Sequence, residues 1–362
     1  MPSVRFSVKP LFVAALGVLS LRAADAPKHK VIIDQDGGGP SVQMVIEDPH
    51  TEVLGITEVT GDTYVKESVA RVLRMLELIG RTDIPVLTGA TYPLVNTEAE
   101  ERVWETLYGP LAWKGAWMEK LPDYDKTNVP AYHGPDVIPA MKEGMPTIKG
   151  SDELAAAFLV RKVREFPGEI TILAMGPFTN LALAQSLDPH FAENCKELII
   201  MGGSFNPKAD REDFLTLQFI HSPRTEFNCR FDPEAVKIML HAGWKKITVV
   251  PFDPCVNTVT TPDLLKRATS SGTKGANYAA ATTVTGFPLW DEGAAAMFLD
   301  PSVASKTRQL LMDIDISHGA NYGSILSWPL GRGPKLGEPE VTVVTEFNLP
   351  KLQGVYISEL NR

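Results

Sequence analysis

The segment Lys30–Asp62, KVIIDQDGGGPSVQMVIEDPHTEVLGITEVTGD, contains two apolar runs that each lead to acidic residues. The first run leads to Asp34, Asp36 and three glycines, and the second leads to Gly61 and Asp62. Ligands of open α/β sheets bind in the crevice beyond the carboxyl ends of parallel strands. We therefore expect two adjacent parallel strands that place carboxylates at one sheet edge, where they bind a metal ion or a sugar. A second interpretation is that Asp34 or Asp36 only caps the helix that follows.

Strand and helix patterns alternate along most of the chain. Apolar runs at residues 84–89, 170–174, 197–201 and 247–250 indicate strands, and periodic segments at 65–79, 151–165, 177–187 and 232–242 indicate helices. Such alternation is typical of βαβ units. We predict the fold class α/β, with one open, mostly parallel sheet and helices on both faces. Ser151 is expected to cap the helix that begins there.

Residues 91–150 break this alternation and form an aromatic-rich insertion. Its aromatic residues lie among many Pro, Gly and charged residues and include Trp104, Tyr108, Trp113, Trp117, Tyr124 and Tyr132. Loops of this length in compact domains are usually functional or disordered, and the aromatic density argues against disorder. Two interpretations stay open. The insertion packs near the mouth of the site, or it forms a satellite cluster that supports the fold.

The composition narrows the class of protein. The 362 residues are 44% hydrophobic and 22% charged, which is typical of a soluble globular protein and fits one large α/β domain. The net charge of −9 argues against a nucleic-acid partner, because phosphate binding relies on clustered Lys and Arg. Cys195, Cys229 and Cys255 have no short paired spacing, so they predict no zinc site or disulfide framework. We expect each to be a buried small residue, although one disulfide bridge is compatible with an extracytoplasmic location.

Residues 1–26 have the parts of a secretory signal peptide. Arg5 and Lys9 precede a short apolar stretch, Leu11–Leu21, and Ala24-Asp25-Ala26 is an A-x-A cleavage motif. The apolar stretch is short for a membrane span. We therefore predict a mature domain of residues 27–362 that is secreted or periplasmic and has no membrane contact after cleavage. An uncleaved anchor is the alternative.

Four further motifs follow later in the chain. They are GPFTNLA at 176–182, IIMGG at 199–203, EFNCRFDPEA at 226–235 and LWDEGAAAM at 289–297. With Asp34–Asp36 and Glu52–Asp62, these motifs resemble the inosine–uridine-preferring nucleoside hydrolase family from about Lys30 to Asp300. The match fails at Gly38–Ser41, where the family has a pair of aspartates. The helix that follows this loop is also expected to be about one turn short.

The resemblance implies a reaction and a cofactor. The reaction is hydrolysis of the N-glycosidic bond of a ribonucleoside or related N-ribosyl compound by metal-activated water, with inversion. By the matching motifs, Asp36 is the catalytic base, and Asp36, the Thr179 carbonyl and Asp291 are ligands of a calcium ion. The alternative for Asp291 is a helix N-cap behind a packing tryptophan.

The resemblance also implies contacts with the substrate. Glu226 and Asn228 bind ribose hydroxyls, because a carboxylate beside an amide suits a vicinal diol. Met201 either lines the ribose or is a buried strand end, and Asn206 is a looser match to an asparagine that binds ribose. Asp62 and Trp290 stand where the family has Asn and often His.

Trp290 cannot protonate the leaving base as that histidine does, but its ring can stack on the base. Neighbouring polar residues have simpler expected roles. We expect Asn180 and Asp232 to cap helices.

The missing aspartates leave three hypotheses open. The preferred one is a hydrolase whose metal site is remodelled, with Asp34 or Asp62 replacing the lost charge. The others are a catalytically degenerate nucleoside- or sugar-binding protein of the same fold, and an unrelated glycosidase on this scaffold. In each case the partner is a small molecule such as a nucleoside or riboside. Because family members are commonly dimers or tetramers, the resemblance also implies a homo-oligomer.

Overall fold

The computed structural model describes residues 2–3, 28–120, 132–205 and 225–362. The predicted signal peptide, apart from residues 2 and 3, and the predicted ribose ligand Asn206 lie outside this part of the chain. Among the described residues, no helix has the length and apolar character needed to cross a membrane.

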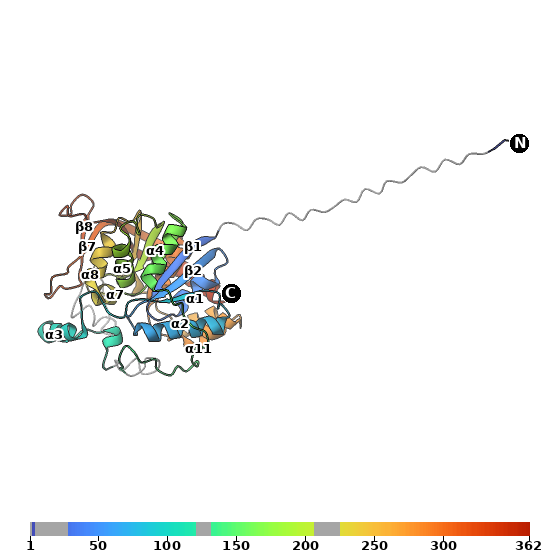
Figure 1. Ribbon diagram of the computed structural model, residues 1–362, viewed down its shortest axis with the longest axis horizontal. Coiled ribbons are helices and arrows are strands. Elements are labelled where there is room, and N and C mark those ends of the chain that lie inside the picture. Colours follow the sequence, from blue (N-terminus) through green and yellow to red (C-terminus); the bar gives the residue numbers. More distant parts are fainter. Residues whose placement is uncertain (1, 4–27, 121–131, 206–224) are drawn as a thin grey trace.

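The described strands form one sheet of nine, in the order β3-β2-β1-β4-β5-β6-β9-β7-β8. Figure 1 shows β1 and β2 toward one side of this sheet and β7 and β8 toward the other. They are β1 (His29–Gln35), β2 (Thr51–Glu58), β3 (Val86–Thr88), β4 (Ile170–Ala174), β5 (Glu197–Met201), β6 (Ile247–Val250), β7 (Ala304–Ile314), β8 (Ile325–Pro329) and β9 (Glu340–Phe347). In this sheet order, all neighbouring strands from β3 through β6 to β9 pair in parallel. Strand β7 is antiparallel to both β8 and β9. The prediction of an open, mostly parallel α/β sheet is confirmed.

Two hydrophobic cores lie on opposite faces of the sheet. Along β1, Val31 and Ile33 pack in one core and Ile32 packs in the other, because successive side chains of a strand point to opposite faces. On β5, Ile199 and Ile200 separate in the same way. Strands buried on both faces are nearly continuous apolar runs, as these are.

Helices cover both cores. One face carries α1 (Pro40–Glu47), α2 (Val65–Ile79), α10 (Pro262–Ala268), α11 (Lys274–Thr282), α12 (Trp290–Leu299) and α13 (Leu349–Leu360), and the other carries α4 (Ala155–Glu165), α5 (Thr179–Leu187) and α8 (Pro233–Leu240). The remaining helical elements are α3 (Glu98–Tyr108), η1 (Gly115–Trp117), α7 (Phe227–Phe231), α9 (Phe252–Cys255) and η2 (Pro301–Val303). The three cysteines are free and buried, as expected.

The expected N-cap at Ser151 is wrong. Helix α4 begins at Ala155, and its N-cap is Leu154. Ser151 instead extends the edge of β3, where it forms a parallel bridge with Leu87 and its amide donates to the Val86 carbonyl at 2.8 Å. A serine followed by two acids therefore belongs here to an edge bridge, because the edge strand supplies a free backbone acceptor.

Candidate active site

The acidic end of β1 lies inside the protein. Asp36 is 4% exposed and Asp34 is fully buried. Neither residue caps the following helix, because the N-cap of α1 is Gly39 and no side chain bonds there. The interpretation of these two aspartates as helix caps is therefore wrong, and both are buried carboxyl groups at the carboxyl edge of the sheet.

Asp34 is held by the two neighbouring elements. Its Oδ2 accepts from the Thr57 hydroxyl at 2.6 Å and from the Asn180 side chain at 2.9 Å. Asn180 also donates to the Glu58 carbonyl and accepts from the Ala90 amide, so it joins the ends of β1, β2 and β3. The expectation that Asn180 caps α5 is therefore wrong, because the N-cap of this helix is Phe178 and no side chain forms a capping hydrogen bond there. Burial raises the pKa of Asp34 to about 7.

The loop after β1, where the motif departs from the family, has a backbone conformation that favours glycine. Gly38 and Gly39 have φ values of 78° and 125°, a region that side-chain-bearing residues rarely adopt. Gln35 closes the loop, since its Oε1 accepts from the Gly38 amide at 2.6 Å and its Nε2 donates to the Gly38 carbonyl. Helix α1 then starts at Pro40 and spans eight residues, and its being a turn shorter than the helix of the family stays a prediction.

Three carboxyl groups interact at this edge. The Asp62 amide donates to Asp36 Oδ2 at 2.8 Å, and a Cβ at Gly61 would collide with the same oxygen. Burial and then the charges of Asp62 and Asp291 raise the pKa of Asp36 well above its ordinary value. Burial, the adjacent Glu292 and the Asp62 charge do the same for Asp291. Asp62 itself is exposed, so the site opens to solvent at this residue.

Glu226 has a structural role that the sequence analysis missed. Its Oε2 accepts from the amides of Gly203 and Cys229, and its Oε1 accepts from the Asn228 amide at 2.9 Å. Glu226 is the N-cap of α7 and is 3% exposed. Its charge also acts on Asp291, so the predicted ribose-binding carboxylate lies within electrostatic range of the acidic edge.

Asn228 fixes the end of β5. Its side-chain nitrogen, Nδ2, donates to the carbonyl of Met201 at 3.1 Å and contacts the Met201 sulfur at 3.4 Å. Both residues are buried, and Met201 is the last residue of its strand. These contacts describe a buried strand end, and the ribose contacts of Met201 and Asn228 stay predictions.

Thr179 and Asp232 are paired. Thr179 is the first residue of α5, and its hydroxyl donates to Asp232 Oδ2 at 2.6 Å. Asp232 is the N-cap of α8, accepts from the Ala235 amide and precedes Pro233, as expected. The Thr179 hydroxyl is therefore held by Asp232, and the calcium contact of the Thr179 carbonyl, which the resemblance implies, stays a prediction.

Trp290 begins α12 and lies in an aromatic cluster. Its ring is 5.8 Å from Phe252 and 6.1 Å from Phe287, measured between centroids. The N-cap of α12 is Leu289 and no side chain bonds there, so Asp291 is not the helix cap that the alternative supposed. Stacking of Trp290 on a nucleobase stays a prediction.

Glu58 is a further buried carboxyl group at this edge, and the sequence analysis did not single it out. It ends β2 and is fully buried, and the Ser68 hydroxyl donates to its Oε2. Its Oε1 has no hydrogen-bond partner among the described residues. Burial raises the pKa of Glu58 to about 8, and the charge of Asp34 contributes. The signal in the sequence was weak, because an acid between Thr57 and Val59 is also typical of an exposed strand position.

The described residues do not by themselves form a calcium site. Calcium takes six to eight oxygen ligands, with several carboxylates in tight sites. Within the described ranges, no three His, Cys, Asp or Glu side chains converge in a way that could hold a metal ion. The loop that supplies two aspartates in the family contains Gly39, Pro40 and Ser41 here, so the arrangement lacks the carboxylates that would complete the set.

The aromatic-rich insertion reaches the candidate site and also forms a small core. Trp117 is 4% exposed and packs with Tyr64 and Phe231 in a separate cluster. The indole nitrogen of Trp113 donates to Asp62 Oδ1 at 2.6 Å. In its described part, the insertion therefore packs near the mouth of the site through Trp113 and forms a satellite cluster that supports the fold through Trp117.

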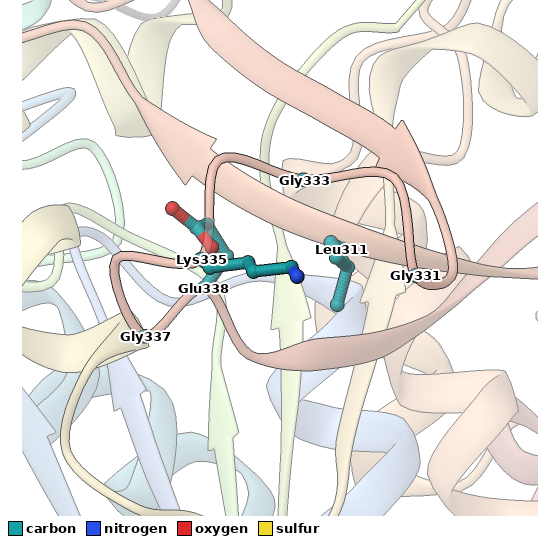
Figure 2. A pocket seen from close by; sticks show the side chains of 6 residues that line it. All are labelled: Leu311, Gly331, Gly333, Lys335, Gly337 and Glu338. Atoms are coloured by element: carbon teal, nitrogen blue, oxygen red, sulfur yellow. The ribbon is translucent and has the colours of Figure 1, made fainter.

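A cavity of about 260 Å³ lies elsewhere, on the antiparallel edge of the sheet (Figure 2). It is lined by Leu311 of β7 and by residues of the loop between β8 and β9, including Lys335 and Glu338. None of the predicted site residues lines it, so this cavity is separate from the acidic edge.

Comparison with known proteins identifies similar sequences. The sequence model of the family described as inosine-uridine preferring nucleoside hydrolase matches residues 31–354. Uridine nucleosidase 1 of Arabidopsis thaliana is 34% identical over 227 residues, which are 62% of this chain and 56% of that protein. The pyrimidine-specific ribonucleoside hydrolase RihB of Escherichia coli (strain SE11) is 24% identical over 336 residues, 88% of this chain and 92% of that protein.

A solved structure has the same fold. The structure titled plant nucleoside hydrolase, PpNRh1 enzyme, aligns with a TM-score of 0.70 and 26% identity. The alignment covers 92% of this chain and 99% of that one.

Proposed function

Because this chain belongs to the inosine-uridine preferring nucleoside hydrolase family, we propose that it hydrolyses the N-glycosidic bond of ribonucleosides with Asp36 as the base. The observation that carries this proposal is the burial of Asp36 at the carboxyl edge of the sheet, beside Asp62 and Asp291. This is the edge at which open α/β sheets bind ligands.

The surroundings of Asp36 suit a general base. A base works best when its pKa lies near the operating pH. Burial and the charges of Asp62 and Asp291 raise the pKa of Asp36 well above the ordinary value, so its carboxylate is more basic than an exposed aspartate. The amide of Asp62 fixes Oδ2 at 2.8 Å, which leaves Oδ1 to take a proton from the attacking water.

In this proposal the other site residues bind the ribose and the nucleobase of the substrate. Negative carboxylates stabilise the oxocarbenium-like charge that develops on the sugar as the glycosidic bond breaks. Glu226 and Asn228 bind the ribose hydroxyls, and Trp290 stacks on the base. The electron pair of the broken N-glycosidic bond leaves with the nucleobase. Uridine is the first substrate to test, because similar proteins are named for activity on uridine or pyrimidine ribonucleosides.

The proposal includes calcium only as an ion bound with the help of Asp62, whose charge lies in a different loop from the aspartates of the family. Asp62 stands where the family has Asn and acts electrostatically on both Asp36 and Asp291. We propose that Asp62 replaces one lost aspartate and that calcium binding is weak, because affinity follows the number of charged ligands. No step above depends on the ion.

Two further proposals concern the whole protein. The charged start, short apolar stretch and A-x-A motif of residues 1–26 favour cleavage and a secreted or periplasmic mature domain of residues 27–362. The family resemblance favours a homo-oligomer that binds small nucleosides.

The test is hydrolysis of uridine by the purified protein, followed as release of ribose, with Asp36→Asn as the matched variant. We expect turnover by the parent and a loss of more than about a thousandfold in Asp36→Asn, because general-base catalysis and charge stabilisation are removed together. Both proteins should have the same circular dichroism spectrum. Binding of uridine without release of ribose by the parent would favour the degenerate binding protein instead.

A further inference from the structure

A short turn of the aromatic-rich insertion lies directly against the loop that carries Asp62. The indole N–H of Trp113 donates to Asp62 Oδ1 at 2.6 Å. Three residues further on, the Ala116 amide donates to the Gly61 carbonyl at 2.8 Å. The insertion therefore contacts this loop through one side-chain and one backbone hydrogen bond, over a sequence separation of about fifty residues.

The close approach depends on two glycines. A Cβ at Gly115 would collide with the Gly61 carbonyl and with the ring of Phe227, and Gly115 has a φ of 53°. A Cβ at Gly61 would in turn collide with Asp36 Oδ2. The turn, the Gly61 backbone and the Asp36 carboxylate are thus stacked in three layers without side chains between them.

Apolar packing holds the turn on its other side. The Trp117 ring lies 4.3 Å from Phe231, between centroids, in a cluster that also contains Tyr64. Within the turn, Lys114 forms an ion pair of 2.8 Å with Glu105 of α3. Phe231 belongs to α7, the helix that Glu226 caps, so the turn is anchored to the element that carries the predicted ribose ligands.

We infer that Trp113 is a positioning residue that orients the Asp62 carboxylate toward the sugar-binding side of the acidic edge. Asp62 is exposed, and an exposed aspartate side chain rotates freely unless a partner fixes it. The hydrogen bond from the indole N–H restricts how the Asp62 carboxylate can rotate. This inference rests on the proposed function and deepens it, because it explains how a charge outside the first loop is held in place.

The experiment is a double-mutant cycle with an iminoribitol as the probe, a cationic ribose analogue that mimics the charge of the transition state. Trp113→Phe keeps the ring and removes the N–H, and Asp62→Ala removes the acceptor. We expect Trp113→Phe to weaken iminoribitol binding about five- to tenfold, as for a lost hydrogen bond to a charged group. In the Asp62→Ala background the same change should cost less than about twofold.

The matched control is Trp244→Phe. The Trp244 indole also donates one hydrogen bond, to the Met239 carbonyl at 2.8 Å, but none of the predicted site residues contacts it. We expect it to leave iminoribitol affinity unchanged. An equal loss for Trp113→Phe in both Asp62 backgrounds, or no greater loss than for Trp244→Phe, would overturn the inference.

A second measurement separates this inference from the proposed function. The chain has six tryptophans, so its indole N–H signals are few in a ¹⁵N–¹H spectrum, and Trp113→Phe identifies one by deletion. We expect that signal to shift in Asp62→Ala and to stay in place in Trp244→Phe. If it does not shift in Asp62→Ala, the inference fails even when uridine is hydrolysed. If it shifts while the parent neither hydrolyses uridine nor binds iminoribitol, the contact stands, but the proposed function and the sugar-orienting role both fail.

Discussion

Replacing Glu58 by glutamine is expected to stabilise the protein at neutral and alkaline pH and to change little at acidic pH. Glu58 is fully buried at the end of β2, and the Ser68 hydroxyl is its hydrogen-bond donor. Glutamine keeps the shape and can still accept from Ser68, but it never ionises. The variant therefore removes only the cost of keeping an ionisable group in a buried position.

The sign follows from the direction of the pKa shift. Burial raises the pKa of Glu58 from an ordinary 4.5 to about 8, so the folded protein holds the proton more tightly than the unfolded chain does. The neutral carboxyl contributes fully below the unfolded pKa, and stability is lost as pH rises toward the folded pKa. At about 1.4 kcal/mol per pH unit, the parent should lose roughly 3 kcal/mol relative to Glu58→Gln between about pH 5 and about pH 7.5.

Urea unfolding at these two pH values, followed by tryptophan fluorescence with a chelator present, measures this difference. Glu52→Gln is the matched control, because Glu52 lies on the same strand, is exposed and has the same chemistry. We expect its free energy of unfolding to follow that of the parent. A difference between Glu58→Gln and the parent that does not change with pH would refute the assignment of Glu58 as a buried neutral acid.

Three other changes have defined outcomes. Glu226→Gln should lower the free energy of unfolding by about 1–3 kcal/mol, because the new NH₂ group faces a backbone N–H, and should weaken binding of ribosides more than of 2′,3′-dideoxy analogues; equal losses for both ligands would make Glu226 purely structural. Asp62→Asn should lower calcium affinity, measured by titration calorimetry, about tenfold; an unchanged value would remove Asp62 from any cation site. Deletion of residues 1–26 should leave a folded protein, because β1 begins only at His29; recovery of that shortened chain only as unfolded aggregate would contradict the cleavable signal peptide.

The parallel part of the sheet could be predicted because its strands are buried on both faces. Runs such as Ile170–Ala174 and Glu197–Met201 are nearly continuous in apolar residues, and their predicted bounds agree with β4 and β5. The helix at Val65–Ile79 was equally clear from its one-sided apolar pattern. The antiparallel strands β7 and β8 expose many side chains, so their sequence carries no comparable signal.

The candidate site could be predicted only in part. Asp34 and Asp36 lie at the carboxyl edge of the sheet as expected, because Asp34 is the next-to-last residue of β1 and Asp36 is the first residue beyond it. The role of Asn180 could not be predicted, because it bonds three strand ends that meet only in the folded sheet. The Trp113–Asp62 contact was hidden for the same reason. It joins two segments whose distance depends on the path of the whole insertion.

The geometry also indicates that the absence of the two family aspartates is linked to the glycine loop after β1 and to the acid at Asp62. Restoring acids at Pro40 and Ser41 would place one at the first residue of α1 and one at a position that is 2% exposed, after a loop that requires positive φ at Gly38 and Gly39. A carboxylate buried there without a partner costs free energy. In this chain the neighbouring charge is instead at Asp62, where the Trp113 indole holds it and solvent reaches it. Under the proposal that Asp62 replaces the lost charge, the loop after β1 and the aromatic-rich insertion have to be considered together, because Trp113 of the insertion donates a hydrogen bond to Asp62.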